Sequence, residues 1–346
     1  MWLKRLSIFA VFLACGVVAL GAYTRLQDAG LGCPDWPGCY GHLVVPKSRE
    51  AISNANAAFP ERPLESHKAW PEMIHRYFAS TLGLVILAIL ALCIRARKNN
   101  PQVPLKLPLF LAALVIFQGL LGMWTVTLGL FPTIVMAHLL GGFTTLCLLF
   151  LLAVRLHNGL PVAASGNKDS EHAFQKKNAV LRFGIIGIVI LGLQIALGGW
   201  TAANYAATVC NELPICQSGW QQHVNISDAF QFWGHGVEDY EFATHLGADA
   251  KITIHVAHRV GAIITTLYLG SLFVWLLVRS NQTPVTRKAA SIALLLLLAQ
   301  VGLGISNVVL DLPLLIAVAH NGVAAILMMA LIFLNLSLYR SGRTIR

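Results

Sequence analysis

Eight long apolar stretches constrain what this 346-residue chain can fold into. A helix needs about 20 apolar residues to cross the hydrocarbon core of a bilayer, and it satisfies its own backbone hydrogen bonds there. The stretches are continuously apolar, whereas the strands of a membrane barrel alternate. With 56% hydrophobic and 12% charged residues, the chain lacks the composition of a soluble globular protein. The sequence predicts an all-α membrane protein with eight transmembrane helices, at about 6–24, 73–94, 107–128, 133–154, 183–202, 253–278, 289–309 and 314–338.

Lys and Arg residues between the stretches predict the orientation of the chain. Basic segments are retained in the cytoplasm, and one follows every second apolar stretch. The segment 203–251 holds six acidic residues and one Lys, which suits the opposite side. We therefore expect a multi-pass protein of the bacterial inner membrane with both termini in the cytoplasm. The net charge of +10 is an orientation signal and does not indicate nucleic-acid binding. The basic residues concerned are Arg95, Arg97, Lys98, Lys168, Lys176, Lys177, Arg279, Arg287, Lys288, Arg340, Arg343 and Arg346.

The chain also repeats itself at a spacing of about 180 residues, close to half its length. Several residue types recur in one order at offsets of 177 to 183. The matching pairs are Gly21-Ala22-Tyr23-Thr24 with Gly198-Gly199-Trp200-Thr201, Cys33 and Cys39 with Cys210 and Cys216, His75-Arg76 with His258-Arg259, Gln118 with Gln300, and Ala137-His138 with Ala319-His320. The recurrence favours a first stretch that belongs to the repeat over one that is a cleavable signal peptide.

Each repeat contains four apolar stretches, an even number, so both halves insert with the same orientation. We expect two four-helix bundles related by a pseudo-twofold axis along the membrane normal. The expected domains are an N-terminal bundle at 1–155, a polar and flexible cytoplasmic linker at 156–182, and a C-terminal bundle at 183–346.

Four histidines at repeated positions are candidate metal ligands, because ionisable residues inside transmembrane segments are costly. His75 and His258 begin the second and sixth stretches, and His138 and His320 lie about six residues into the fourth and eighth. All four stretches run inward from the external face, so each half can oppose two imidazoles across its bundle. Two neutral imidazoles without a third recurring ligand favour bis-axial ligation of a haem iron over a zinc site. The alternative is that the histidines are hydrogen-bonded packing residues.

Charged residues accompany these histidines. Arg76 and Arg259 follow a candidate ligand directly, and a guanidinium there can pair with haem propionates or snorkel to the membrane surface. Glu72 lies three residues before His75, on the same face of the helix, whereas the second half has His255 at that position. A shielded carboxylate beside a porphyrin can transfer protons or stabilise a cation. The alternative is an interfacial ion pair with Arg76 or Lys68.

Two cysteine pairs lie on the expected external side, where disulfides persist. The short loop within Cys33–Cys39 would contribute only about 2 kcal/mol to stability by loop closure, so a redox or site-shaping role competes with a structural one. We interpret Cys210–Cys216 as mostly structural.

Taken together, these motifs resemble the haem A synthase family across essentially the whole chain. The resemblance rests on Thr24-Arg25 through Cys33-Pro34-Asp35-Trp36-Pro37-Gly38-Cys39, on Glu72-Met73-Ile74-His75-Arg76 and Ala137-His138, and on His258-Arg259 and Ala319-His320. The segment 217–251 matches no family pattern.

The resemblance implies an oxidoreductase that converts the C8 methyl group of haem O into the formyl group of haem A by successive hydroxylations, for cytochrome oxidase biogenesis. It implies haem O between His75 and His138, and a permanent haem B between His258 and His320. Glu72, Cys33 and Cys39 match positions implicated in catalysis. The implied partners are haem O synthase, cytochrome oxidase assembly factors and an electron carrier of unknown identity, and the oligomeric state stays open.

Two rival functions remain from the residues alone. A di-haem b-type cytochrome that transfers electrons from quinol explains the four histidines but leaves Glu72 unexplained. A thiol–quinone oxidoreductase using the external cysteines makes the histidines incidental.

Overall fold

The computed structural model describes residues 2–158, 171–233, 246–280 and 282–341, with only the backbone described at 171–179. These residues form helices, turns and loops, and they contain no β-strand. The basic residues Lys168, Arg343 and Arg346 lie outside the described part of the chain.

Within the described residues, eight helices are long and apolar enough to cross a membrane, and they confirm the eight predicted spans. Shorter elements lie in the two long connections: α2 (Arg49–Ala58), a 3₁₀ turn (Trp220–His223) and α7 (Ile226–Ala229). The long helices are α1 (Trp2–Leu26), α3 (Ser66–Asn99), α4 (Lys106–Thr127), α5 (Pro132–Asn158), α6 (Glu171–Ala203), α8 (Ala248–Val278), α9 (Pro284–Val309) and α10 (Leu314–Ser341).

The long helices extend beyond the apolar stretches, most of all in α3 and α6. α3 begins seven residues before the expected 73, so Glu72 and His75 lie inside the helix and not at its start. Both ends of the expected linker 156–182 are helical, since α5 reaches Asn158 and α6 begins at Glu171. Good helix formers at 171–179, including two Lys, one Gln and two Ala, allow the backbone hydrogen bonds to continue past the apolar segment.

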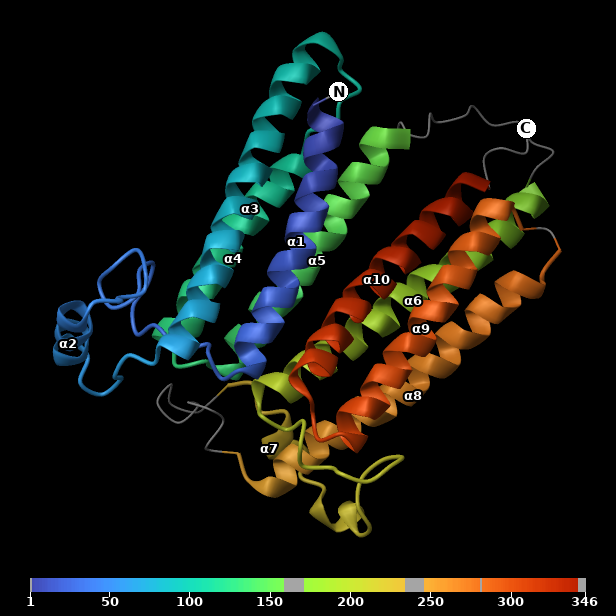
Figure 1. The fold of residues 1–346 in the computed structure, drawn as a ribbon. Helices are drawn as coiled ribbons and strands as arrows, with labels where there is room; N and C mark the ends of the chain where they lie inside the picture. Colours follow the sequence, from blue (N-terminus) through green and yellow to red (C-terminus); the bar gives the residue numbers. More distant parts are fainter. Residues whose placement is uncertain (1, 159–170, 234–245, 281, 342–346) are drawn as a thin grey trace.

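The helices form two groups that lie side by side (Figure 1). α1 packs on α3 and α5, and α4 packs on the same two helices. The pairs repeat in the second group, where α6 packs on α8 and α10, as does α9. α1 contacts α10 and α5 contacts α6 across the boundary. The pseudo-twofold axis itself stays a prediction.

The two ends of the molecule differ. The start of α1 and the end of α10 lie at one end, and the segments 27–65, 204–233 and 246–247, with α2 and α7, lie at the other (Figure 1). We call the second the long-loop end.

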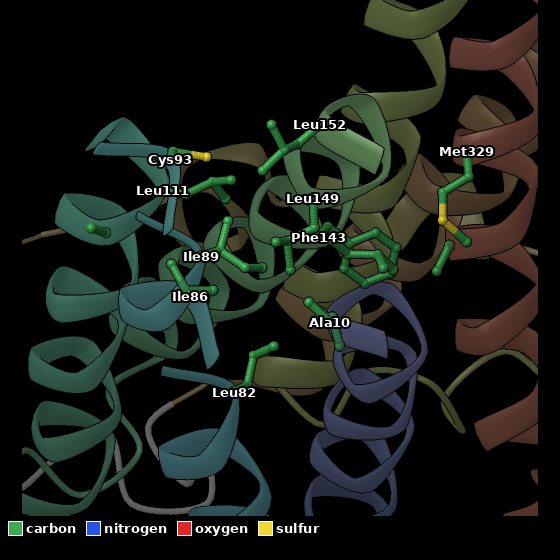
Figure 2. Close-up of a cluster of buried hydrophobic side chains, with 14 of the residues drawn as sticks. Ala10, Leu82, Ile86, Ile89, Cys93, Leu111, Phe143, Leu149, Leu152 and Met329 are labelled. Carbon is green, nitrogen blue, oxygen red and sulfur yellow. The ribbon is translucent and has the colours of Figure 1, made fainter. Parts of the chain in front are cut away.

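A buried apolar cluster holds the first group together and reaches into the second (Figure 2). Ala10 and Ala14 of α1 belong to it together with Ala324 and Ala325 of α10. Small residues let membrane helices approach closely, and packing is what drives their association in lipid. Its larger members include Leu82, Ile86, Ile89, Leu111, Phe143, Leu146, Leu149, Leu152 and Met329.

Candidate functional site

The structure brings His75 of α3 and His138 of α5 together inside the first bundle. The centroids of their rings lie 6.4 Å apart, and the ring planes are nearly perpendicular, at 86°. A metal bound to two imidazoles at about 2 Å separates the ring centres by about 6 Å. The spacing of this pair therefore fits one iron between two axial histidines.

A glycine on a neighbouring helix lies against each of the four rings. A methyl group built on Gly21 would lie 3.0 Å from Cε1 of His75, and one on Gly198 would lie 3.1 Å from Cε1 of His258. The corresponding distances are 3.4 Å from Gly122 to His138 and 3.2 Å from Gly304 to His320. Each imidazole is thus packed where a larger residue would displace it. Gly122 and Gly304 are offset by 182 residues, so an extended search of the repeat would have found them.

The second bundle pairs His258 of α8 with His320 of α10, whose rings are close enough to interact electrostatically. A glutamine amide contacts each ring. Nε2 of Gln194 lies 3.0 Å from Nδ1 of His258, and Nε2 of Gln300 lies 3.1 Å from Nε2 of His320. In the first bundle, Nδ1 of His75 and of His138 makes no hydrogen bond within the described residues.

The paired histidines differ from the ligand sets of other metal sites. Among the described residues, no group of three or more His, Cys, Asp or Glu is arranged to hold a metal ion. Zinc is usually bound by four ligands, whereas a haem iron, which is held by its porphyrin, needs only axial ligands from the protein. Paired imidazoles, packed against glycines, fit a haem.

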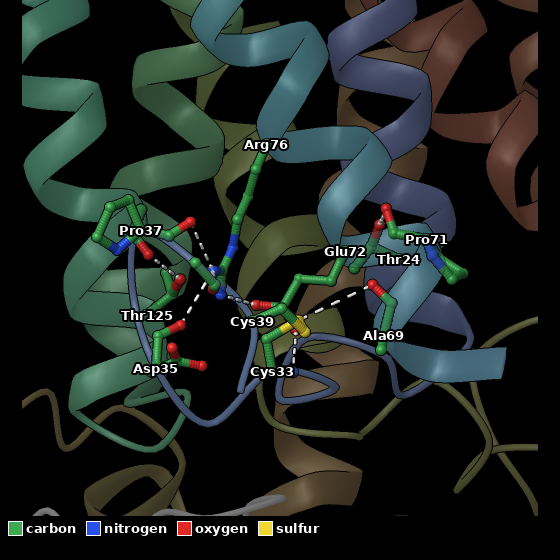
Figure 3. Close-up of polar contacts among 12 residues, drawn as sticks. Thr24, Cys33, Asp35, Pro37, Cys39, Ala69, Pro71, Glu72, Arg76 and Thr125 are labelled. Carbon is green, nitrogen blue, oxygen red and sulfur yellow. Dashed lines mark hydrogen bonds and ion pairs between the residues drawn. A yellow bond between two sulfur atoms is a disulfide. The ribbon is translucent and has the colours of Figure 1, made fainter. Parts of the chain in front are cut away.

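Glu72 is buried, with 4% of its surface exposed, and both of its carboxylate oxygens are bonded (Figure 3). Oε2 accepts a hydrogen bond of 2.8 Å from the backbone N–H of Cys33, and Oε1 pairs with the guanidinium of Arg76. The ion pair with Arg76 is the alternative expected from the sequence, whereas Lys68 pairs with Glu65. The carboxylate is held against the cysteine loop.

Arg76 also binds that loop through its backbone carbonyls. Its Nη1 donates to the carbonyl of Asp35 at 3.0 Å, to that of Pro37 at 3.3 Å, and to that of Gly38. The loop is closed by the Cys33–Cys39 disulfide, so one guanidinium joins the closed loop to α3 (Figure 3).

The second half repeats this grip on the loop closed by Cys210–Cys216. Arg259 donates to the carbonyls of Cys210, Glu212 and Ile215. Each of these carbonyls lies 177 residues after a member of the first loop. The partner of Arg259 on its own helix is an imidazole, since its Nε lies 3.2 Å from Nε2 of His255. The role of the arginines in holding the loops was missed by sequence reasoning, because no pattern of side chains marks a backbone carbonyl as an acceptor.

Arg25 joins the two halves at the long-loop end, a contact that sequence reasoning also missed. Its guanidinium lies 3.7 Å from the centre of the Tyr205 ring and donates to the carbonyl of Ala202, and it pairs with Asp28 at 3.4 Å. Ala202 is the residue that matches Arg25 in the repeat. Burial and the Asp28 carboxylate raise the pKa of Tyr205 to about 12, although Arg25 opposes them.

The segment 217–251 packs on both halves, although its residues 234–245 lie outside the described part. Nδ1 of His223 lies 2.9 Å from Asp249 Oδ1, and Asn225 donates to Thr253 on α8. Thr133 of the first bundle donates to the carbonyl of Phe232.

The chain is similar to known proteins along most of its length. Residues 4–332 match the COX15-CtaA family model, described as cytochrome oxidase assembly protein. A Heme A synthase of Shewanella oneidensis is 46% identical over 342 residues, which are 99% of this chain and 97% of that relative. A Heme A synthase of Beijerinckia indica subsp. indica is 30% identical over 349 residues, covering 94% of this chain and 89% of that relative.

Proposed function

This chain belongs to the COX15-CtaA family of cytochrome oxidase assembly proteins, and from that premise we propose that it is a haem A synthase. In this reaction the C8 methyl group of haem O is oxidised to the formyl group of haem A, so the enzyme is an oxidoreductase. The observation that carries the proposal is the opposed pair His75 and His138, at a spacing that suits one iron, in a chain similar along nearly its whole length to a Heme A synthase.

The two bundles take different parts in this proposal. The bundle at 1–155 binds substrate haem O between His75 and His138. The bundle at 183–346 holds haem B between His258 and His320, and the segment 156–182 connects them on the cytoplasmic side. Haem B supplies reversible one-electron chemistry when it is bound. The asymmetry between Glu72 and His255 supports a reactive first half.

Glu72, Cys33 and Cys39 are the proposed catalytic residues. Glu72 lies three residues before His75 and is shielded from water, so its carboxylate can move a proton or stabilise positive charge near the substrate. The hydrogen bond from the Cys33 N–H fixes one of its oxygens. Arg76 and Arg259 hold the loops over the two sites, and their contact with haem propionates stays a prediction.

The proposed setting is the bacterial inner membrane, with both termini cytoplasmic and the long-loop end outside. The basic segments between the helices support this orientation. Haem O synthase, cytochrome oxidase assembly factors and an electron carrier are the proposed partners. Neither a di-haem cytochrome nor a thiol–quinone oxidoreductase is favoured, since the named relatives are Heme A synthases.

Identification of the porphyrins extracted from purified protein tests the function. We expect haem B together with haem O or haem A. In His75→Ala we expect haem B alone, and in His258→Ala a loss of haem B. Haem B alone in the wild type would support a cytochrome, and no haem would support a thiol enzyme; either result contradicts the proposal.

A further inference from the structure

The two halves differ in what holds the first histidine of each pair. In the second half, the side chain of Gln194 on α6 contacts His258 twice. Its Nε2 lies 3.0 Å from Nδ1 of the ring and donates to the backbone carbonyl of the same residue at 3.0 Å. A single amide therefore fixes both the ring and the helix segment that carries it.

The first half has no such amide. The residue that matches Gln194, at an offset of 177, is Val17. The ring of His75 faces the backbone carbonyl of Val17 instead, and its Nδ1 makes no hydrogen bond of normal geometry within the described residues.

A second substitution accompanies the first. A methyl group on Gly261 of α8 would lie 2.3 Å from Oε1 of Gln194, so the amide occupies space that only glycine leaves. The residue that matches Gly261, at an offset of 183, is Phe78. The second half thus carries Gln194 with Gly261 where the first carries Val17 with Phe78. Because the amide and the glycine that makes room for it both differ from the first half, the contact of Gln194 with His258 is a specific feature of the second half.

A partner on the free ring nitrogen changes a histidine ligand. Metal-bound histidines donate their other N–H to an acceptor, which fixes the ring and makes it a stronger donor to the metal. As placed, the amide presents its Nε2 donor to Nδ1, whereas an imidazole that binds iron through Nε2 carries a proton on Nδ1. A half-turn of the amide presents Oε1 as the acceptor for that N–H.

We propose that Gln194 is a positioning residue that makes His258 a permanent axial ligand, and that its absence from the first half lets His75 take and release a substrate haem. This inference rests on the proposed function, because it assumes that haem B occupies the second half. It gives a physical reason why one of two similar sites retains its haem and the other exchanges it.

The test compares Gln194→Met, which keeps the volume and removes the amide, with the wild-type holoprotein. The matched control is Asn335→Leu. Asn335 is a buried amide on α10 that lies against Gly184 of α6, as Gln194 lies against Gly261, but it is 15 residues from His320, about 22 Å along the helix. Transfer of haem from detergent-purified protein to excess apomyoglobin gives the rate of loss, and pyridine haemochrome spectra distinguish haem B from haem O and haem A.

We expect Gln194→Met to lose haem B about 10–100-fold faster than the wild type, the usual effect of removing an outer-shell partner. Loss of haem O or haem A should be unchanged. The midpoint potential of the haem B that remains should rise, because a weaker donor stabilises the ferric iron less. A change in packing alone would not move that potential.

Haem B retention and potential equal to those of the wild type would overturn the proposal, as would an equally fast loss from Asn335→Leu. Wild-type protein that binds haem O or haem A without any haem B would contradict the proposed function instead. The two failures are therefore distinguishable.

Discussion

Glu72 shows how one side chain can join a transmembrane helix to a loop. Its two oxygens are divided between the Cys33 backbone N–H and the Arg76 guanidinium, and Arg76 in turn bonds the carbonyls of the same disulfide-closed loop. The second half keeps the arginine and the loop but has an imidazole at the carboxylate position. Holding the loop thus requires only the arginine, which leaves the carboxylate of the first half available for chemistry.

Replacement of Glu72 separates these two roles. We expect Glu72→Ala to retain bound haem, because Arg76 still grips the loop, and to stop haem A production in cells supplied with haem O. Glu65→Ala is the control, since Glu65 pairs with Lys68 at the exposed start of the same helix. Analysis of cellular haems measures the outcome, and normal haem A output from Glu72→Ala would remove this residue from the mechanism.

At the scale of helices, apolar length was sufficient to predict all eight spans, because a bilayer leaves a chain few alternatives to a helix. The short α2 was not predicted, since its start depends on a single local bond from the Ala51 N–H to the Ser48 hydroxyl. The histidine pairs were predicted from recurrence in the sequence. Gly21 and Gly198 belong to the repeat, but their contact with the rings was not predicted, because a glycine in an apolar stretch does not reveal which side chain of a neighbouring helix it faces.

The glycine beside His75 gives a prediction at this scale. In Gly21→Leu the new side chain begins 3.0 Å from Cε1 of His75, so the ring must move away from its partner. We expect loss of haem O and haem A from the purified protein, with haem B retained. Gly16→Leu on the same helix is the control, because a methyl group there meets nothing within 4 Å. Haem O binding that survives Gly21→Leu would contradict the role assigned to this packing.

At the scale of the whole molecule, the boundary between the halves combines apolar helix contacts with one charged contact. α1 meets α10 and α5 meets α6 along the spans, and Arg25 closes the boundary at the long-loop end. The repeat predicted two halves, but it could not predict this contact, since Arg25 matches Ala202 and so has no counterpart in the second half.

Removal of the Arg25 contact should weaken the association of the two halves. Arg25→Ala leaves the Ala202 carbonyl and the Tyr205 ring without their cationic partner, and we expect a loss of about 1–3 kcal/mol in unfolding free energy. This loss should appear as a lower thermal unfolding midpoint in detergent. Arg5→Ala, at an exposed position on the same helix, should leave that midpoint unchanged. An equal midpoint for both variants would show that the charged contact does not stabilise the boundary.

The helix contacts across this boundary have a consequence for how such a chain can arise. In the repeat, α1 corresponds to α6 and α5 to α10, so the contacts of α1 with α10 and of α6 with α5 are the same pairing made twice. An interface in which two like units exchange the same two surfaces is isologous, as in a symmetric dimer. Under the predicted pseudo-twofold relation, each four-helix unit carries both surfaces needed to pair with its own copy, and joining two copies in one chain permits each to diverge at residues such as position 194 without altering the other.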